Sequence, residues 1–385
     1  MSQTNPNRAV LRQGLGVHQR GVTLIELMVA MVLGLLLTAG VIQVFIGNRA
    51  TYAFNESLSW IQENARFAVD QIANNARMAG YAGCLSDVAV INNLNSPNPF
   101  RDDLENGLQG FEFLGTGTGQ LFAAGAVDPM PLGNANAWSP ALPPELVNPT
   151  ARVIPGSDVL VVRYVNGDSN SLVTPFSDSA QVFVGGPSDF QEGEIVVVTD
   201  CQKASIFQIT QVQLVGGGPD VNLAHSNASY TPGNSAPSAW GPQQSYGLGS
   251  EIARLQTVAF YVGRGESGQP SLFQLRLQRI DATTSRVEPE ELVEGIDTMQ
   301  VRYGVDTDAD RQVDAWRTAD AVAAANDWGN VLSVEITLLA RGAEEYGTET
   351  DTAIYNAGGM RFDPVDDRRL RQVFTTTVGV RNRLP

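Results

Sequence analysis

Arg20-Gly21-Val22-Thr23-Leu24-Ile25-Glu26-Leu27 is the stretch that decides how this chain is organised, because it joins a basic leader to an apolar run. Residues 1–20 contain three arginines and no acidic residue, and residues 27–48 carry no charge at all. Residues 27–46, LMVAMVLGLLLTAGVIQVFI, reach the ~20 apolar residues that a helix needs to cross a bilayer. The arginine excess ahead of this span predicts a cytoplasmic N-terminus and an exported body.

Gly21 and Glu26 are the two unusual residues of this stretch. In an ordinary secretory signal, the small residue that marks the cleavage site follows the apolar core. Gly21 precedes the core instead, so cleavage after it would leave the apolar helix on the mature chain. A carboxylate such as Glu26 at the edge of an apolar helix is costly unless it is paired, which makes it a functional candidate. The simpler alternative is an acid that water solvates at the level of the lipid headgroups.

This leader resembles the class III leader of type IV pilins, through the Gly21-Val22 junction, the run Thr23-Leu24-Ile25-Glu26-Leu27 and the span behind it. The resemblance implies that a prepilin peptidase cleaves after Gly21 and methylates the new amino group of Val22. It also implies that Glu26, fifth in the mature chain, pairs with the N-terminal amine of a neighbouring subunit during assembly. The chain departs from the family at Val22, where Phe is commoner, and in lacking the kinking proline of many major pilins.

An amphipathic pattern after the span predicts that the helix continues beyond the membrane. Between residues 49 and 80, apolar side chains recur every three or four positions, which is the spacing of one helix face. Gly80 can end such a helix, so its end is expected near Ala79. This face can pack on the chain's own body or on neighbouring subunits, and packing on the body is the simpler alternative. The face consists of Phe54, Leu58, Ile61, Ala65, Ala68, Ile72, Ala76 and Ala79.

The rest of the chain is predicted to be mainly β. Residues 92–150 are rich in Asn, Pro and Gly and are expected to be loops with a few short elements. Residues 216–250 are expected to be a Gly/Pro/Ser/Asn loop, and 319–327 is a candidate short helix. In 271–280 apolar and polar residues alternate, which predicts a strand with one solvent-exposed face. Compact apolar or alternating runs predict strands at 158–165, 194–199, 205–215, 255–264, 271–280, 299–305, 331–340 and 372–380.

The expected fold class is therefore α+β and pilin-like, with a long N-terminal helix packed on a mainly antiparallel β body that has long loops. In this interpretation residues 1–21 are the prepilin leader and residues 22–80 the pilin helix, of which 27–46 cross the membrane. Residues 81–385 form the exported, mainly β globular domain.

Composition limits the classes of partner. The chain has 385 residues and a formal net charge of −16, which becomes −19 once the leader's three arginines are removed. Such an acidic body is poorly suited to nucleic acid, because binding to phosphate depends on Lys and Arg. Nucleic acid is therefore not expected as a direct partner.

Cys84 and Cys201 are the two cysteines. An exported body permits a disulfide, and one bridge across so long a loop would stabilise the fold by about 4–5 kcal/mol in the loop-entropy model. Two buried free thiols are the alternative. Zinc is disfavoured because the only histidines are His18, in the leader, and His225.

Beyond the leader, three stretches resemble the PilW family of minor pilins. They are 77–84 (RMAGYAGC), 199–207 (TDCQKASIF) and 294–306 (EGIDTMQVRYGVD), and the predicted strand at 331–341 also fits. Because the first two each contain a cysteine, the resemblance favours pairing of Cys84 with Cys201.

The PilW resemblance also implies a function and a set of partners. It implies a low-abundance subunit that primes filament assembly with other minor pilins and sits at the tip. The implied partners are other minor pilins, the major pilin, the prepilin peptidase, the inner-membrane assembly platform and a tip adhesin. The implied location is the bacterial inner membrane, with a single pass and a periplasmic body, and then the pilus filament.

The best remaining constellation is the acidic run 306–314, DTDADRQVD. Asp306, Asp308, Asp310 and Asp314 echo the spacing of a calcium loop of EF-hand type, whose oxygen ligands converge on a hard cation. Arg311 stands where that loop needs Gly, and Arg317 where it needs a bidentate Glu. The simpler alternative is an acidic surface turn, and apart from calcium no cofactor is expected.

Catalysis has little support in the sequence, and no enzyme is expected. A Ser/His/Asp or Cys/His device needs a positioned histidine, and only His225, in a predicted loop, would remain after processing. Paired carboxylates for glycoside chemistry stay an open alternative. The leading hypothesis is a minor pilin for twitching, adhesion or DNA uptake. The alternatives are a pseudopilin of type II secretion, a ligand-binding module at the pilus tip and, least favoured, an exported membrane-anchored enzyme.

Overall fold

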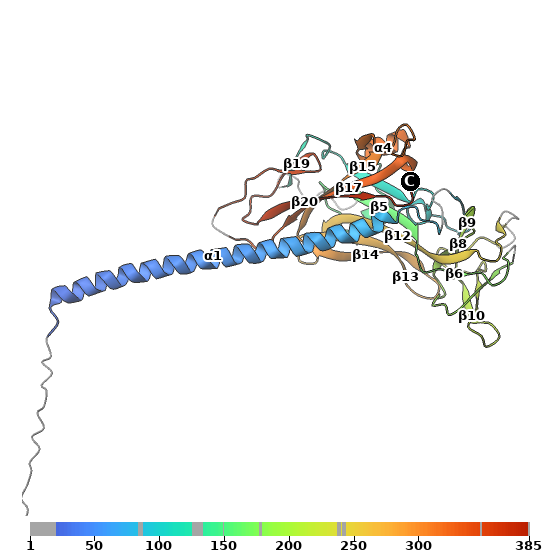
Figure 1. The fold of residues 1–385 in the computed structure, drawn as a ribbon, viewed down its shortest axis with the longest axis horizontal. Helices are drawn as coiled ribbons and strands as arrows, with labels where there is room; N and C mark the ends of the chain where they lie inside the picture. The colour runs from blue at the N-terminus through green and yellow to red at the C-terminus, as the bar shows by residue number, and fades with distance from the viewer. Residues whose placement is uncertain are drawn as a thin grey trace, which may run out of the picture. The chain divides into compact units, whose positions relative to one another are not determined.

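The computed structural model divides into two compact units, with the boundary between Ala53 and Phe54. Helix α1, Leu24–Arg77, runs through this boundary (Figure 1). Within the described part of the chain, α1 is the helix that is long and apolar enough to cross a membrane. The basic leader lies outside the described residues. These are 21–83, 88–124, 134–148, 150–176, 179–236, 240, 244–346 and 349–383.

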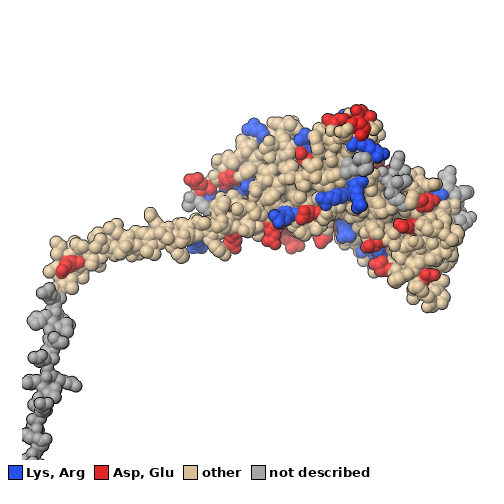
Figure 2. Space-filling model, in the orientation of Figure 1, with Lys and Arg blue, Asp and Glu red and all other residues tan. Residues whose placement is uncertain are grey.

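The first part of α1 exposes its apolar side chains on every face. All residues from Gly21 to Tyr52 are exposed, and no charge interrupts the stretch between Leu27 and Asn48 (Figure 2). A continuous apolar surface of this kind is unfavourable in water. It therefore requires lipid or other apolar helices around it.

The second part of α1 packs on the β body through the predicted face. Ile61, Ala65, Ala68, Ile72 and Ala76 are all buried, so packing on the chain's own body is confirmed. Small alanines dominate this face, which allows a close approach of helix and sheet. The helix ends at Arg77, and Gly80 follows at a φ of 72°, in the left-handed region that glycine adopts without strain.

The largest sheet has ten strands in the described residues and follows the order β1-β9-β8-β12-β5-β2-β4. Strand β12 also pairs with β6 and β13, and β13 pairs with β14. All pairings are antiparallel except that of β1 with β9. The strands are β1 (Ala89–Asn92), β2 (Leu108–Phe113), β4 (Trp138–Ser139), β5 (Val159–Val165), β6 (Asn170–Ser171), β8 (Ile195–Thr199), β9 (Lys203–Gln208), β12 (Glu251–Arg264), β13 (Pro270–Arg279) and β14 (Ser285–Glu294).

A second, antiparallel sheet follows the order β16-β15-β17-β20, and two small three-stranded sheets complete the described fold. Figure 1 shows β17 and β20 side by side in the second sheet. Its strands are β15 (Ile296–Val305), β16 (Ala315–Arg317), β17 (Val331–Arg341) and β20 (Arg371–Gly379). The small sheets contain β7 (Gln181–Val184), β10 (Gln211–Leu214) and β11 (Val221–Ala224), and β3 (Leu121–Ala123), β18 (Tyr355–Ala357) and β19 (Met360–Asp363). Short helices lie at α2 (Pro99–Asp102), α3 (Pro144–Val147) and α4 (Ala319–Ala325).

The main core lies where α1 meets the two large sheets. It joins the helix face to inward side chains of β12, such as Phe260, and of β15 and β17, such as Val301 and Ile336. A second core on the other side of β17 takes in Leu339 together with β18 and β19. Strand β17 is therefore covered on both faces. The α+β fold class with a mainly antiparallel body is confirmed.

Several element boundaries differ from the sequence prediction. The predicted strand at 205–215 is two strands in different sheets, because β9 ends at Gln208 and β10 begins at Gln211. The predicted loop at 216–250 contains β11, whereas the few short elements predicted within 92–150 are present and include β2. Strand β14 was missed because its Pro289 and its glutamates are unusual in strands. The alternation predicted for 271–280 is confirmed, since Phe273, Leu275 and Leu277 are buried.

Candidate functional site

The junction between the leader and the helix is built as a reciprocal helix cap. The backbone N–H and the hydroxyl of Thr23 both donate to Glu26 Oε2, at 3.0 and 2.9 Å. The backbone N–H of Glu26 donates in return to Thr23 Oγ1 at 3.3 Å. This is a capping box, in which two otherwise unpaired N–H groups at the helix start are satisfied. Thr23 is a residue that the sequence analysis missed, although a Thr three residues before a Glu at a helix start is a known signal.

Gly21 and Val22 lie exposed just ahead of this cap. A Cβ atom added at Gly21 would meet no other atom within 4 Å, and Gly21 has no left-handed backbone conformation that demands glycine. The fold therefore does not require glycine at this position. Any requirement for glycine at position 21 must therefore come from a partner protein that binds this exposed segment.

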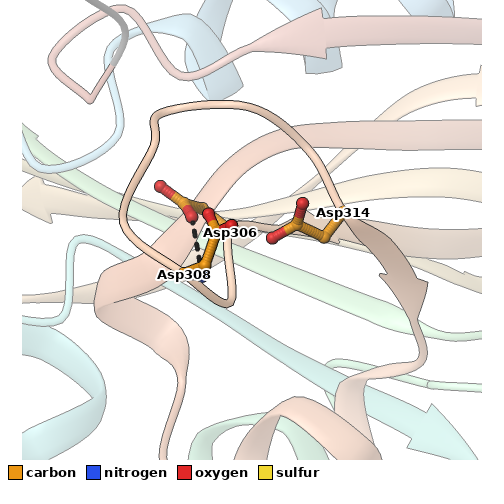
Figure 3. Close-up of side chains that lie close together, drawn as sticks. All are labelled: Asp306, Asp308 and Asp314. Atoms are coloured by element: carbon orange, nitrogen blue, oxygen red, sulfur yellow. Dashed lines mark hydrogen bonds between the residues drawn. The ribbon is translucent and has the colours of Figure 1, made fainter.

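The acidic loop after β15 brings three of its four aspartates together. One carboxylate oxygen from each of Asp306, Asp308 and Asp314 lies within 4.8 Å of the others, and Figure 3 shows the three side chains grouped inside the loop. Asp306 is buried and the other two are exposed. Asp310 is not in this group, because its carboxylate accepts from the backbone and side chain of Gln312.

Hydrogen bonds hold the loop in this shape. Asp306 accepts from the backbone N–H groups of Ala309 and Arg311, at 2.7 and 2.9 Å. Asp314 accepts from the N–H and the hydroxyl of Thr307, and these bonds lower the pKa of its carboxyl below the ordinary value. Arg311 has a φ of 66°, so it adopts the left-handed conformation that glycine would supply in a calcium loop.

Of the two cysteines, only Cys201 lies among the described residues. Cys201 follows β8, in the turn to β9, with a φ of 70°. Cys84 lies outside the described residues. The Cys84–Cys201 disulfide therefore stays a prediction.

His225, the histidine that would remain after processing, lies in a loop as the sequence predicted, but its side chain is buried. It follows β11 and is completely buried, with its ring stacked on Trp240 at 4.0 Å between ring centroids. Phe207 and Phe176 pack on it as well. Burial lowers its pKa to about 4, so the ring is neutral near pH 7. A neutral, enclosed ring is a core residue and is poorly placed for catalysis on a substrate.

Two carboxyls, those of Asp158 and Glu112, are buried in the body. Both oxygens of Asp158 accept backbone N–H groups, from Phe113 on β2 at 3.0 Å and from Val301 on β15 at 2.9 Å. Burial raises the pKa of Asp158 to about 7, and burial together with the Asp158 charge raises that of Glu112 to about 9. Asp158 thus ties the two large sheets together, and its role is structural.

Comparisons with known families agree with this arrangement. Residues 259–382 match the family model of the type IV pilus-assembly protein W, and residues 17–42 match the prokaryotic N-terminal methylation motif. The PilW match covers β13 to β20 and the C-terminal part of β12. The methylation match includes Gly21, Val22 and Glu26. The resemblance to the PilW family and to a class III prepilin leader is thereby confirmed.

The PilW model describes pilus assembly, and neither matched model describes an enzyme. Among solved structures, the chain is similar to the type IV-like pilin TTHA1219 from Thermus thermophilus, at 13% identity and a TM-score of 0.22. That match covers 50% of this chain and 86% of the other, and nothing further is inferred from it. No curated protein matches the chain.

Proposed function

We propose that this type IV pilin-like chain, with its PilW region and its N-terminal methylation motif, is a minor pilin that helps to prime assembly of a type IV pilus. The observation that supports the proposal most directly is the coincidence of three features at one place. These are an exposed glycine before the helix, a capping box that contains Glu26 at the helix start, and an uncharged apolar helix behind it. Interaction with other pilus components follows from the family matches.

In this proposal the prepilin peptidase cleaves after Gly21 and methylates Val22, while α1 anchors the chain in the inner membrane with its body in the periplasm. Glu26 then pairs with the N-terminal amine of a neighbouring subunit. The other partners are the remaining minor pilins, the major pilin, the assembly platform and, at the tip, an adhesin. Because α1 exposes uncharged and mostly apolar side chains between residues 27 and 46, the same surface suits the membrane first and neighbouring helices later.

A pseudopilin of type II secretion is the alternative of the same structural class, and a ligand-binding module at the tip is the alternative of another class. Deletion of the gene distinguishes them. Loss of surface pili and of twitching is the outcome expected for a minor pilin. Normal piliation with defective protein secretion would favour the pseudopilin, and normal piliation with lost adhesion would favour the binding module.

The cleavage assignment has its own test in the Gly21→Trp variant. Because a side chain at Gly21 meets no atom of this fold, the change should leave the body folded and block processing, so that full-length protein accumulates in the membrane. Immunoblots of membrane fractions measure the size. A variant that runs at the mature size would contradict cleavage after Gly21.

For the acidic loop we propose calcium binding by Asp306, Asp308 and Asp314. Calcium takes six to eight oxygen ligands in flexible geometry, so backbone carbonyls and water would complete the shell around three carboxylates. The convergence of the three oxygens within 4.8 Å supports this proposal. Asp310, the fourth residue in the predicted set, points to Gln312 instead.

Calorimetric titration of the full chain in detergent tests the calcium proposal. We expect weak binding, with a Kd of about 10⁻⁴–10⁻³ M as in extracellular calcium modules. Asp308→Ala should abolish the heat of binding, whereas Asp310→Ala is the matched control and should retain it. Absence of heat at millimolar calcium with the wild-type chain would contradict the site.

A further inference from the structure

Strand β20 forms one edge of the second sheet. It pairs with β17 on one side over nine residues, from Arg371 to Gly379, and is the terminal strand of the order β16-β15-β17-β20. Figure 1 shows β20, in dark red, beside β17.

The hydrogen-bond register shows which backbone groups of β20 face away from β17. At one end of the β17–β20 pair the N–H of Val380 donates to Leu332 O at 2.8 Å, and at the other the N–H of Gly342 donates to Leu370 O, also at 2.8 Å. Bonding residues alternate along an antiparallel pair, so the even-numbered residues of β20 bond to β17. The odd-numbered residues direct their N–H and C=O groups outward, and within the described residues these groups have no hydrogen-bond partner. They are Val373, Thr375, Thr377 and Gly379.

Other sheet edges are protected against a further strand. Strand β14 carries Pro289 and four glutamates, and such charges and prolines discourage pairing between edges. Strand β1 is only four residues long, and the outward N–H of Val90 already donates to Glu105 Oε1 at 3.2 Å. In β20, by contrast, residues 372–380 contain neither a charge nor a proline. Thr375 and Thr377 are exposed there.

The charge at the end of this edge is also distinctive. In a chain of net charge −16, the C-terminal end of β20 lies beside two exposed arginines. They are Arg77, the last residue of α1, and Arg381, which follows β20. The two residues lie close together because the backbone N–H of Arg381 donates to the backbone O of Arg77 at 3.1 Å. Neither arginine makes an ion pair within the described residues. A strand that lies along β20 would therefore be favoured if it carried an acidic residue at this end.

We propose that β20 binds an extended strand of a neighbouring pilus subunit, with an acidic residue of that strand facing Arg77 and Arg381. Backbone hydrogen bonds supply the affinity in such strand addition, and the flanking side chains supply the specificity. A different subunit suits the edge better than a second copy, because self-pairing would bring together two strongly acidic bodies. The proposal rests on the proposed function as a pilus subunit.

The test compares Thr377→Pro with Thr377→Val in cells that assemble pili. Proline at Thr377 removes an outward N–H without removing a bond to β17, because Thr377 is an odd-numbered position. Valine keeps the N–H and the β-branched shape. We expect incorporation into sheared filaments, relative to the membrane pool, to fall about tenfold for the proline variant, as for a lost hydrogen bond with added steric exclusion, and to stay near wild type for valine. Thermal melting of both chains in detergent checks that they fold.

Hydrogen exchange provides a measurement that needs no variant. The outward amides of Val373, Thr375 and Thr377 should exchange rapidly in the detergent-solubilised chain and become protected in filaments. Equal incorporation of the two variants, or equal exchange in both states, would overturn strand pairing at β20 and leave the proposed function intact. Absence of the wild-type chain from filaments would instead overturn the proposed function, and this inference with it.

Discussion

At the scale of single residues, Glu26 has a local partner before it meets any neighbour. Its carboxylate is held by the N–H and hydroxyl of Thr23 in the capping box. If Glu26 pairs with a neighbouring N-terminal amine during assembly, that amine joins or displaces these bonds. Thr23 is therefore a positioning residue for Glu26.

The prediction for Thr23 compares two substitutions. Thr23→Val keeps the shape but removes the hydroxyl, and loss of such a cap costs about 1 kcal/mol of helix stability. We expect normal processing of this variant but reduced incorporation into filaments, whereas Thr23→Ser should behave as wild type. Quantitative immunoblots of the membrane and filament fractions measure both steps. Equal incorporation of the two variants would show that the hydroxyl does not position Glu26.

Glu112 is the residue whose ionisation should be visible in the stability of the fold. Burial raises its pKa to about 9 in the folded chain, so the native state holds a proton that the unfolded state loses at much lower pH. Its contribution to stability is complete below the ordinary pKa of 4.5 and is lost as the pH rises toward about 9.

The Glu112→Gln variant tests this assignment, because glutamine resembles the protonated acid and cannot ionise. We expect the melting temperature of the wild-type chain to fall between about pH 5 and about pH 9, and to fall less in the variant. Thermal unfolding followed by circular dichroism measures the difference. Parallel pH profiles for the two chains would count against a protonated Glu112.

At the scale of elements, α1 performs two tasks with two different surfaces. Up to residue 53 it exposes apolar side chains on all sides, and from Ile61 onward it buries one alanine-rich face in the core. The unit boundary between Ala53 and Phe54 therefore assigns the second part of the helix to the β body. The domain boundary proposed from sequence, at residue 80, instead follows the end of the helix.

A cavity-forming substitution tests the packing of α1. Ile72 is fully buried in the main core, so Ile72→Ala should destabilise the body by about 2–5 kcal/mol. Asp70→Ala, on the exposed side of the same helical turn, is the matched control and should change stability by less than about 0.5 kcal/mol. Chemical denaturation of the detergent-solubilised chains measures both. Similar values for the two variants would contradict the packing of this face on the body.

At the scale of the whole molecule, charge is distributed unequally between the apolar part of α1 and the β body. Residues 27–48 carry no charge, while the body carries the acidic excess. The apolar helix can interact with any apolar neighbour and therefore gives little selectivity. We therefore propose that selection of particular partners depends on the β body, where charges and open backbone groups differ from place to place. The acidic loop and the β20 edge are two such places.

The sequence alone determined the leader, the span, the amphipathic continuation of α1 and the α+β class. Each of these depends on a local pattern, such as the position of Gly21 before the apolar core or the three-to-four spacing that ends near Ala79. A local pattern can be read from the chain because neighbouring residues create it.

Only the tertiary structure decided how distant segments meet. The division of 205–215 between two sheets, the burial of His225 under Trp240 and the separation of Asp310 from the other three aspartates depend on contacts between residues far apart or on loop hydrogen bonds. The open edge of β20 is of the same kind. An uncharged run predicts a strand, but whether its second side is covered depends on which strands pair, and that is settled by the packing of the whole body.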